Sequence, residues 1–266
     1  MKKLKVLGMI TLNEGHNLKV ILPIAKEIFD KIIVVDSGSK DDTKEICEKY
    51  NIDFFYRDFD GFGNQWNYLL GLIDEGNLFV KMDPDERYNL KFLEILNQIL
   101  TEGNENTIYI LKRRWHLLGK PLLISDNVER IWFTNKTIKF SSNSLNERPV
   151  GYKHSSYLNY TIEHLDSKCL SDWIDKNNKY SSLEADNYIN GLTFDTKPGF
   201  NSFRAIKMLI KKHFFKIPFR HVLVFFYFFL IKGLCWNGYR GYLASILWTS
   251  NYIWKEIKVK EKTIWK

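Results

Sequence analysis

Three observations predict an α/β fold with a mainly parallel sheet flanked by helices. Short apolar runs alternate with segments of helical periodicity over residues 5–82. The run over residues 31–36 is nearly all apolar, as in a parallel strand covered on both faces. Polar side chains follow several of these runs, at the carboxyl ends where parallel sheets bind ligands. The pattern therefore predicts a sheet with a ligand site along one edge.

The first part of the chain contains four strands, each an apolar run bounded by polar or turn-forming residues. Between them, apolar side chains recur every three or four residues, which indicates helices. The first helix keeps this spacing despite Pro23, and the second follows a turn rich in helix-capping residues. In chain order the expected elements are strand 5–11, helix 18–28, strand 31–36, a short helix ending near residue 50, strand 52–56, helix 62–73 and strand 78–82.

The remainder of the chain is less regular. Its apolar periodicity predicts helix 90–100, strand 107–111, strands 129–133 and 137–140, a loop over 141–146, and helix 170–185. From residue 202 onward the chain is expected to be helical, basic and aromatic. We therefore expect a sheet domain over residues 1–196 and a basic, aromatic, helical C-terminal appendage over residues 197–266.

The positive charge of the protein is concentrated in this appendage. The formal net charge is +8, but residues 197–266 contain 14 Lys and Arg against 2 Asp and Glu, a net charge of +12. The first 196 residues therefore have a net charge of −4, and the appendage also holds 17 of the 41 aromatic residues. A basic tail of this kind indicates an anionic partner such as lipid or nucleic acid.

Two kinds of site and one kind of targeting segment are not expected. The three cysteines include no Cys-x-x-Cys pair, and their odd number does not suit a disulfide framework or a zinc site. The N-terminal apolar run is interrupted by Lys5, and no small-residue cleavage site follows it. We expect a cytoplasmic chain.

Two aspartates follow the strand expected over residues 78–82. Pro84 ends regular pairing, and Asp83 and Asp85, two apart on an extended chain, project to the same side. Carboxylate oxygens suit Mg²⁺ or Mn²⁺, which would hold a diphosphate in its remaining coordination positions. An acidic turn in which Asp85 caps the next helix is the alternative interpretation.

Four segments resemble family 2 inverting glycosyltransferases with the GT-A fold. Within that family, the stretches 175–185 and 232–241 are similar to the lipopolysaccharide-core β-glucosyltransferase branch. The four segments are Thr11-Leu12-Asn13-Glu14, Ile33-Val34-Val35-Asp36-Ser37-Gly38-Ser39, Gly61-Phe62-Gly63-Asn64-Gln65 and Asp83-Pro84-Asp85-Glu86-Arg87.

The resemblance implies a role for each matched residue. Asp85 would ligate the metal, Asp83 would touch the ribose or the metal, and Glu147 would be the catalytic base. Arg130 matches an arginine of the branch that precedes a short strand. Apart from the resemblance, either of the adjacent arginines Arg113 and Arg114 is a candidate to neutralise the diphosphate leaving group, and the alternative is a surface charge pair. The remaining nucleotide-sugar contacts would be Thr11, Asn13, Glu14, Asp36 and Gln65.

The implied reaction is metal-assisted single displacement with inversion. The donor would be a nucleoside-diphosphate sugar, with a uridine diphosphate sugar expected, and the acceptor a lipid-linked or lipopolysaccharide-core saccharide. A metal held by Asp85 would act as the charge sink for the leaving diphosphate, and a carboxylate would take the proton of the acceptor hydroxyl.

The tail is expected to bind the anionic inner face of the cell membrane, not nucleic acid. Its longest uncharged apolar run, residues 222–231, has ten residues, whereas a bilayer-spanning helix takes about 20. Basic residues flank this run and can reach lipid headgroups. The alternative is that residues 222–231 form a core helix of the globular fold.

Two other functions are compatible with parts of the sequence. A sugar nucleotidyltransferase has a similar α/β layer, but it would require a glycine-rich phosphate loop and a lysine after the first strand, where this chain has Leu12-Asn13-Glu14. A non-catalytic membrane- or nucleic-acid-binding protein would account for the basic tail, although not for the carboxylates at the sheet edge. Hydrolysis of sugar nucleotides with and without a divalent metal distinguishes these functions.

Overall fold

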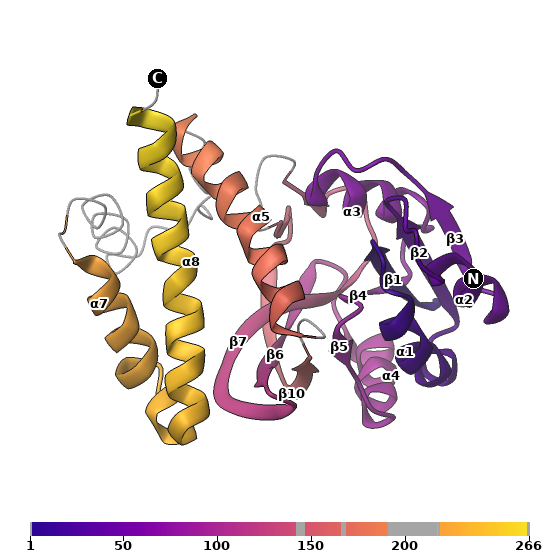
Figure 1. Cartoon of the computed structure of the whole chain (residues 1–266). Coiled ribbons are helices and arrows are strands. Elements are labelled where there is room, and N and C mark those ends of the chain that lie inside the picture. Colours follow the sequence, from indigo (N-terminus) through magenta and orange to yellow (C-terminus); the bar gives the residue numbers. More distant parts are fainter. Residues whose placement is uncertain (1, 142–146, 166–168, 191–216, 218, 265–266) are drawn as a thin grey trace. The chain divides into compact units, whose positions relative to one another are not determined.

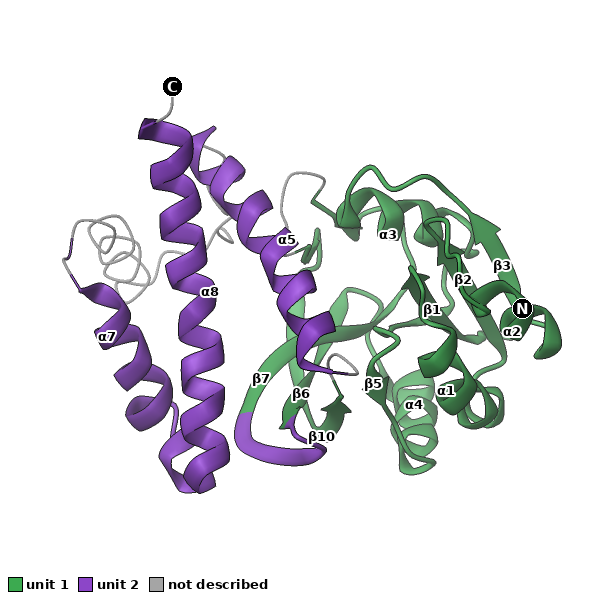
Figure 2. Cartoon of the chain, viewed as in Figure 1, with its two compact units in different colours: residues 1–116, 125–166 green, residues 117–124, 167–266 purple. Residues whose placement is uncertain are grey.

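The computed structural model describes residues 2–141, 147–165, 169–190, 217 and 219–264 (Figure 1). It forms two compact units, which Figure 2 shows in different colours. Unit 1 consists of Met1–His116 and Ser125–Asp166, and unit 2 of Leu117–Ile124 and Ser167–Lys266.

An eight-stranded, mainly parallel sheet has the strand order β3-β2-β1-β4-β7-β6-β10-β5. β1 pairs in parallel with β2 and β4, β2 pairs in parallel with β3, and β10 pairs in parallel with β6. β4 pairs antiparallel with β7, and β10 with β5. Its strands are β1 Lys5–Thr11, β2 Lys31–Asp36, β3 Asp53–Tyr56, β4 Leu78–Lys81, β5 Glu86–Arg87, β6 Thr107–Leu117, β7 Lys120–Phe133 and β10 His154–His164.

Four helices accompany the sheet in unit 1: α1 Gly15–Ile28, α2 Thr43–Lys49, α3 Phe62–Gly71 and α4 Lys91–Glu102. Successive strand residues enter two different core clusters because their side chains alternate between faces. Leu7 of β1 belongs to the cluster that holds Leu22 of α1 and Phe92 of α4. Its neighbour Val6 belongs to the cluster that holds Trp66 of α3. The parallel strands have continuous apolar sequences because both faces of the sheet are buried.

The structure confirms the α/β class and the first four predicted strands, and it adds strands that the apolar pattern did not indicate. β6 and β7 are longer than expected and are joined by a two-residue turn, Leu118–Gly119. β10 has the sequence HSSYLNYTIEH, in which polar residues and partly exposed positions hide any apolar run. The strand expected over 137–140 is β8 Lys139–Phe140, which pairs with β9 Pro149–Val150 in a separate two-stranded sheet.

Unit 2 contains a long helix, α8 Gly238–Ile264, and a second helix, α5 Leu170–Ile189. Between them in sequence come α7 Arg220–Phe226, the π-helix η1 Tyr227–Ile231 and the 3-10 helix η2 Leu234–Asn237. Among the described residues, no single helix has the length and apolar content to cross a bilayer. The pair Arg220–Ile231 and Leu234–Ile264, bent by 68°, meets that length and composition requirement only together.

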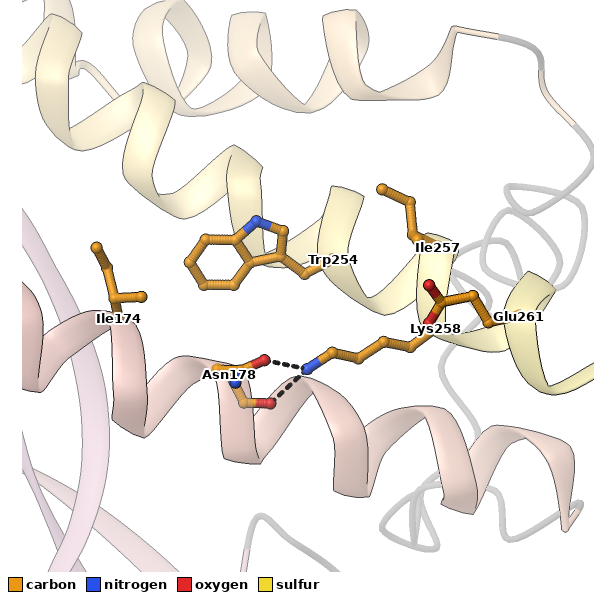
Figure 3. Close-up of a pocket in the computed structure, with 6 residues that line it drawn as sticks. All are labelled: Ile174, Asn178, Trp254, Ile257, Lys258 and Glu261. Atoms are coloured by element: carbon orange, nitrogen blue, oxygen red, sulfur yellow. Dashed lines mark hydrogen bonds between the residues drawn. The ribbon is translucent and has the colours of Figure 1, made fainter.

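α5 is tied to α8 along its length. Asn251 Nδ2 donates to Asn177 Oδ1 at 2.9 Å, and Lys255 Nζ lies 3.0 Å from Glu184 Oε2. A pocket of about 250 Å³ lies between the two helices, and Figure 3 shows Lys258 donating across it to Asn178. The lining residues are Ile174, Asn178, Trp254, Ile257, Lys258 and Glu261.

The packing of α5 on α8 also bears on the domain division. The expected boundary between residues 196 and 197 lies in the stretch 191–216, outside the described residues, as does the expected helical segment 202–216. The compact unit that holds α8 begins at Ser167 instead, because it includes α5, and it also takes in Leu117–Ile124.

Candidate active site

The first part of the site is the loop after β2, which is organised around Asp36. Thr11 and Asp36 are register partners at the ends of β1 and β2, and Thr11 Oγ1 donates to Asp36 Oδ1 at 2.8 Å. The same carboxylate accepts from the backbone N–H groups of Gly38 at 2.8 Å and Ser39 at 2.7 Å. Asp36 is buried, so its charge is compensated by these donors while it fixes the shape of the loop.

The loop after β1 is bonded to the loop after β2. Asn13, with a positive φ of 59°, donates its N–H to Ser39 Oγ at 2.7 Å and accepts from the N–H of Lys40 at 2.8 Å. The N–H of Glu14 donates to Thr43 Oγ1 at 3.0 Å. Thr11, Asn13, Glu14 and Asp36 are therefore brought to one edge of the sheet, as the sequence predicted.

Asp41 reinforces the same junction. Its carboxylate accepts from the N–H of Gly15 at 3.0 Å and from Thr43 Oγ1 at 2.5 Å. Desolvation opposes ionisation, but these hydrogen bonds outweigh it and hold the pKa of Asp41 below its ordinary value. The junction is thus built for a fixed backbone conformation.

Gln65 lies behind this edge rather than on it. Its side chain is fully buried, and its amide donates to Ser37 Oγ and to the carbonyl oxygen of Arg57, both at 2.9 Å. Its Oε1 accepts from Arg57 NH1 at 3.0 Å. In this structure Gln65 supports the loop that contains Ser37, and its predicted contact with the nucleotide sugar stays a prediction.

The second part of the site is a buried ion cluster beyond the end of β4. Arg130 NH2 lies 2.6 Å from Asp83 Oδ2 and 2.5 Å from Glu86 Oε1. Arg113 NH1 lies 3.9 Å and 3.8 Å from the same two oxygens. Sequence reasoning singled out Asp83, Arg113 and Arg130 but missed Glu86, which is fully buried on β5.

The pKa values in this cluster diverge because the burial and the partners differ. Burial alone would raise the pKa of Asp83, but the positive charges of Arg130, Lys81 and Arg113 outweigh it and place that pKa well below the ordinary range. At Glu86 the burial dominates, and its pKa is raised despite Arg130. Asp83 is therefore an anion. Burial lowers the pKa of Arg130, but the charges of Asp83 and Glu86 outweigh it and raise that pKa well above its ordinary value, so Arg130 is a cation.

Asp85 does not cap a helix, because the two-residue strand β5 follows it directly. Its Oδ2 lies 3.3 Å from His164 Nε2, and its carbonyl oxygen accepts from the N–H of Leu165 at 2.9 Å. His164 ends β10 opposite Glu86. Burial lowers the pKa of His164, but the hydrogen bond and charge of Asp85 outweigh it, so that pKa is raised.

Asp85 and His164 together fit a divalent metal ion. A carboxylate oxygen and an imidazole nitrogen are both metal donors, and the nitrogen favours Mn²⁺ over Mg²⁺, which takes oxygen ligands. Within the described ranges, no group of three His, Cys, Asp or Glu side chains could hold a metal. An ion held here would take its remaining donors from water and from a bound diphosphate.

Glu147 joins the ion cluster through a lysine that sequence reasoning missed. Lys81 Nζ lies 2.9 Å from Glu147 Oε1 and 4.0 Å from Asp83 Oδ1. Lys81 is buried, and its ammonium group lies 4.8 Å from the centre of the Trp66 ring. The extended arrangement expected for Asp83 and Asp85 is not observed, because Pro84 and Asp85 form a turn in which the N–H of Glu86 donates to the carbonyl oxygen of Asp83 at 2.9 Å.

Two further residues connect the parts of the site. Asn17 Nδ2 donates to Glu14 Oε2 at 2.7 Å, and Arg87 NH2 donates to Asn17 Oδ1. Arg87 NH1 donates to the carbonyl oxygen of Pro84 at 2.8 Å. The Asn13–Glu14 loop and the Asp-Pro-Asp segment are therefore bridged by Arg87 and Asn17, neither of which was singled out from the sequence.

Arg113 is oriented by Asp126. Its Nε and NH2 donate to the two carboxylate oxygens at 3.2 and 2.7 Å, and Trp115 Nε1 donates to the same carboxylate at 3.2 Å. Burial lowers the pKa of Arg113, but the hydrogen bond and charge of Asp126 outweigh it, so that pKa is raised. A fixed guanidinium beside Asp83 is suited to binding a diphosphate.

Comparison with protein families gives one match, which covers residues 7–144 and is described as Glycosyl transferase family 2. Among curated proteins, the SPbeta prophage-derived glycosyltransferase SunS of Bacillus subtilis is 27% identical over 169 residues, which is 58% of this chain and 37% of that protein. The lipopolysaccharide core biosynthesis glycosyltransferase LpsC of Rhizobium meliloti is 23% identical over 230 residues, which is 81% of this chain and 77% of that protein. The chain thus spans little more than a third of the length of SunS.

Solved structures also resemble the chain. The glucosyl-3-phosphoglycerate synthase of Mycobacterium tuberculosis, in complex with Mn²⁺, uridine diphosphate and glucosyl-3-phosphoglycerate, is 21% identical with a TM-score of 0.34, over 43% of this chain and 44% of that one. A mycobacterial protein is 16% identical with a TM-score of 0.45, over 69% of this chain and 74% of that one.

Proposed function

The chain belongs to glycosyl transferase family 2, whose model matches residues 7–144, and on that premise we propose that it transfers a sugar from a nucleoside-diphosphate sugar to a saccharide acceptor. The observation that carries the proposal is the convergence of Asp83, Asp85, Glu147 and two arginines at one edge of the sheet. This arrangement offers a metal site, a cation for a leaving diphosphate and a carboxylate that can accept a proton.

We assign the nucleotide to the junction of the loops that follow β1 and β2. The hydrogen bonds among Asn13, Ser39 and Asp36 preorganise this junction before any ligand binds. A preformed polar pocket lowers the entropic cost of binding. A uridine diphosphate sugar is the donor that we expect here.

We assign the diphosphate to the neighbourhood of Asp85 and Arg113. Asp85 and His164 would hold Mn²⁺ or Mg²⁺, and a bound ion would supply Lewis-acid stabilisation of the departing diphosphate. Arg113, held in place by Asp126, adds a fixed positive charge on the same side. Arg130 instead neutralises Asp83 and Glu86, so we assign it the role of keeping the cluster folded.

We assign the base role to Glu147. Direct displacement at the anomeric carbon needs a carboxylate that takes the proton from the acceptor hydroxyl as the new bond forms. The Lys81 ammonium group lies 2.9 Å from Glu147 Oε1, and this charge-assisted hydrogen bond fixes the position of the carboxylate. Displacement in one step inverts the anomeric configuration, because no enzyme-bound sugar intermediate is formed.

We propose a lipid-linked or lipopolysaccharide-core saccharide as the acceptor. LpsC, which aligns over 81% of this chain, is named for lipopolysaccharide core biosynthesis, and the stretches 175–185 and 232–241 resemble the same branch. The identity of the acceptor is a more specific proposal than the type of reaction, and the two are tested separately.

The experiment is a transfer assay with a panel of radiolabelled sugar nucleotides, membrane extract as acceptor, and Mn²⁺, Mg²⁺ or a chelator. We expect one uridine diphosphate sugar to label the lipid-extractable fraction only when a metal is present, with inversion seen in the anomeric proton couplings of the product. Nucleotide release that is independent of metal, or formation of a sugar nucleotide from a sugar phosphate, would contradict the proposal.

A further inference from the structure

Two distant segments of unit 2, residues 117–124 and 231–239, expose five large apolar side chains. They are between 71% and 80% exposed. We call them the tip surface: Leu118, Leu123, Ile231, Trp236 and Tyr239. An isolated exposed leucine is ordinary, but a group of this size that includes Trp and Tyr marks a site of interaction.

The two segments are joined directly. The N–H of Leu123, just after the turn between β6 and β7, donates to Asn237 Oδ1 at 2.9 Å. Asn237 is the residue after Trp236, so Leu123 and Trp236 lie in adjoining backbone segments. Figure 2 shows both segments in the colour of unit 2, near the N-terminal end of α8. Each segment also has a buried residue close to the exposed ones, since Leu122, next to Leu123, is 2% exposed and Leu234, two positions before Trp236, is 0% exposed.

The turn that presents Trp236 and Tyr239 has a fixed shape. Gly233 and Gly238 both have positive φ, at 79° and 57°, a conformation that side chains disfavour. A Cβ added at Gly241 would lie 1.7 Å from the carbonyl oxygen of Leu234. The glycines in the stretch 232–241 therefore build a tight turn that holds the aromatic side chains outward.

The charged residues within the two tip segments are all basic. The stretches 117–124 and 217–255 contain no Asp or Glu, while Lys120 and Lys232 are exposed within the two tip segments. Trp and Tyr with flanking Lys is the composition that proteins place at a membrane–water interface, where each ring has one apolar side and one hydrated side.

We propose that the tip surface inserts into the headgroup region of an anionic lipid bilayer. Apolar side chains would enter the interface, and Lys120 and Lys232 would contact lipid phosphates. A second copy of the chain fits less well, because two positive surfaces would meet and five side chains fall short of the roughly 20–30 residues per side in a stable interface. The proposal does not depend on the transfer reaction.

The test is cosedimentation of the full chain with vesicles of equal parts phosphatidylglycerol and phosphatidylcholine, and with pure phosphatidylcholine. We expect binding to the anionic vesicles at low salt, and a roughly tenfold or greater loss in the double variant Leu123→Ser/Trp236→Ser, because two apolar side chains no longer leave water. The double variant Lys120→Glu/Lys232→Glu should bind the anionic vesicles more weakly than the wild type does, whereas its binding to pure phosphatidylcholine vesicles should be unchanged.

The matched control is Ile257→Ser/Ile264→Ser. These residues are 49% and 74% exposed on α8, and Ile264 is roughly 38 Å from Tyr239 along the helix by the rise per residue. We expect this variant to bind vesicles like the wild type, with all variants giving equal circular dichroism and Tm.

Wild-type binding by the Leu123→Ser/Trp236→Ser variant, or equal loss in the control, would overturn the proposal. A change in oligomeric state between wild type and tip variant without vesicles would assign the surface to protein association instead.

Discussion

Lys81 Nζ lies 2.9 Å from Glu147 Oε1, so the carboxylate that we assign as the base is held by a buried ammonium group at the end of a core strand. The same ammonium group lies 4.0 Å from Asp83. Residues 66 positions apart are thereby connected, and the proposed base is tied to the segment that contains Asp85, the proposed metal ligand. This arrangement leads to predictions that separate binding, chemistry and stability.

Glu147→Gln should lower the rate of transfer by roughly 10²–10⁴, the usual contribution of general-base catalysis, while donor binding changes little. Single-turnover kinetics would measure the chemical step, and calorimetry with uridine diphosphate and Mn²⁺ would measure binding. Glu105→Gln, at an exposed loop position paired with Lys3, serves as the control and should behave as wild type. Weaker binding with an unchanged chemical step would assign Glu147 to the binding of the donor.

The Lys81–Glu147 contact should appear as a coupling energy. Lys81→Met removes the charge but retains a long side chain in the buried position, and it should lower the free energy of unfolding by about 1–3 kcal/mol. Combined with Glu147→Gln, the two changes should be non-additive by about 0.5–3 kcal/mol in urea unfolding. Additive effects would mean that the 2.9 Å contact contributes nothing to the native state.

Asp85→Asn should remove the effect of metal on nucleotide binding without unfolding the protein. We expect the affinity of the wild type for uridine diphosphate to rise when Mn²⁺ is added. The affinity of the variant for Mn²⁺ should be lower than that of the wild type by at least about 10–100-fold, because even the loss of a residue that hydrogen-bonds to a metal ligand lowers metal affinity by that factor. Calorimetric titrations with and without Mn²⁺ measure both values. Asp175→Asn, at an exposed position of α5, is the control, and an undiminished metal response in Asp85→Asn would refute the assignment.

Cys47 should be inert while the protein is folded. It is fully buried, and burial, together with the negative charges of Asp36 and Glu48, raises the pKa of its thiol to about 12. Because only the thiolate is nucleophilic, the exposed Cys169 should react with iodoacetamide at pH 8, and Cys47 only after unfolding in urea. Peptide mapping by mass spectrometry identifies the labelled residues, and rapid native labelling of Cys47 would contradict its placement in the core.

The sequence predicted those parts of the fold whose signal is local. The strands that became β1, β2 and β4 are continuous apolar runs, and such runs need no knowledge of their neighbours to be recognised. β10 has no such run, because only Ile162 and His164 of its eleven residues are buried and the others are exposed or partly exposed. Its position in the sheet depends on pairing with β6 and β5, which only the three-dimensional structure reveals.

The same distinction holds within the candidate site. Asp83 and Asp85 lie in one short motif and could be found by inspection, whereas His164 reaches Asp85 from β10, 79 positions later in the chain. Lys81 resembled an ordinary strand residue until Glu147 was found against it. Glu86 lies within the motif segment, but its burial could not be foreseen without the position of Arg130. Partners that are distant in sequence are therefore the part of the site that sequence reasoning missed.

Lys258 should be the lysine on which unit 2 depends most. Its ammonium group donates to Asn178 Oδ1 at 2.6 Å and to Ser181 Oγ and Ser182 Oγ, both at 2.8 Å (Figure 3 shows the bonds to Asn178). Ser181 is buried, so Lys258→Met would leave acceptors on α5 without their donor and should lower the free energy of unfolding by about 1–3 kcal/mol.

The matched control for this prediction is Lys260→Met on the same helix. Lys260 is exposed, and its Nζ lies 2.8 Å from Oε1 of Glu256, a carboxylate that also pairs with Arg220. A helix ion pair four residues apart contributes only about 0.3–0.5 kcal/mol. Urea unfolding followed by circular dichroism compares the two variants at equal helix propensity and equal loss of charge. A stability change at Lys258 no larger than that at Lys260 would mean that the hydrogen bonds that Lys258 donates across the pocket contribute nothing to the packing of α5 on α8.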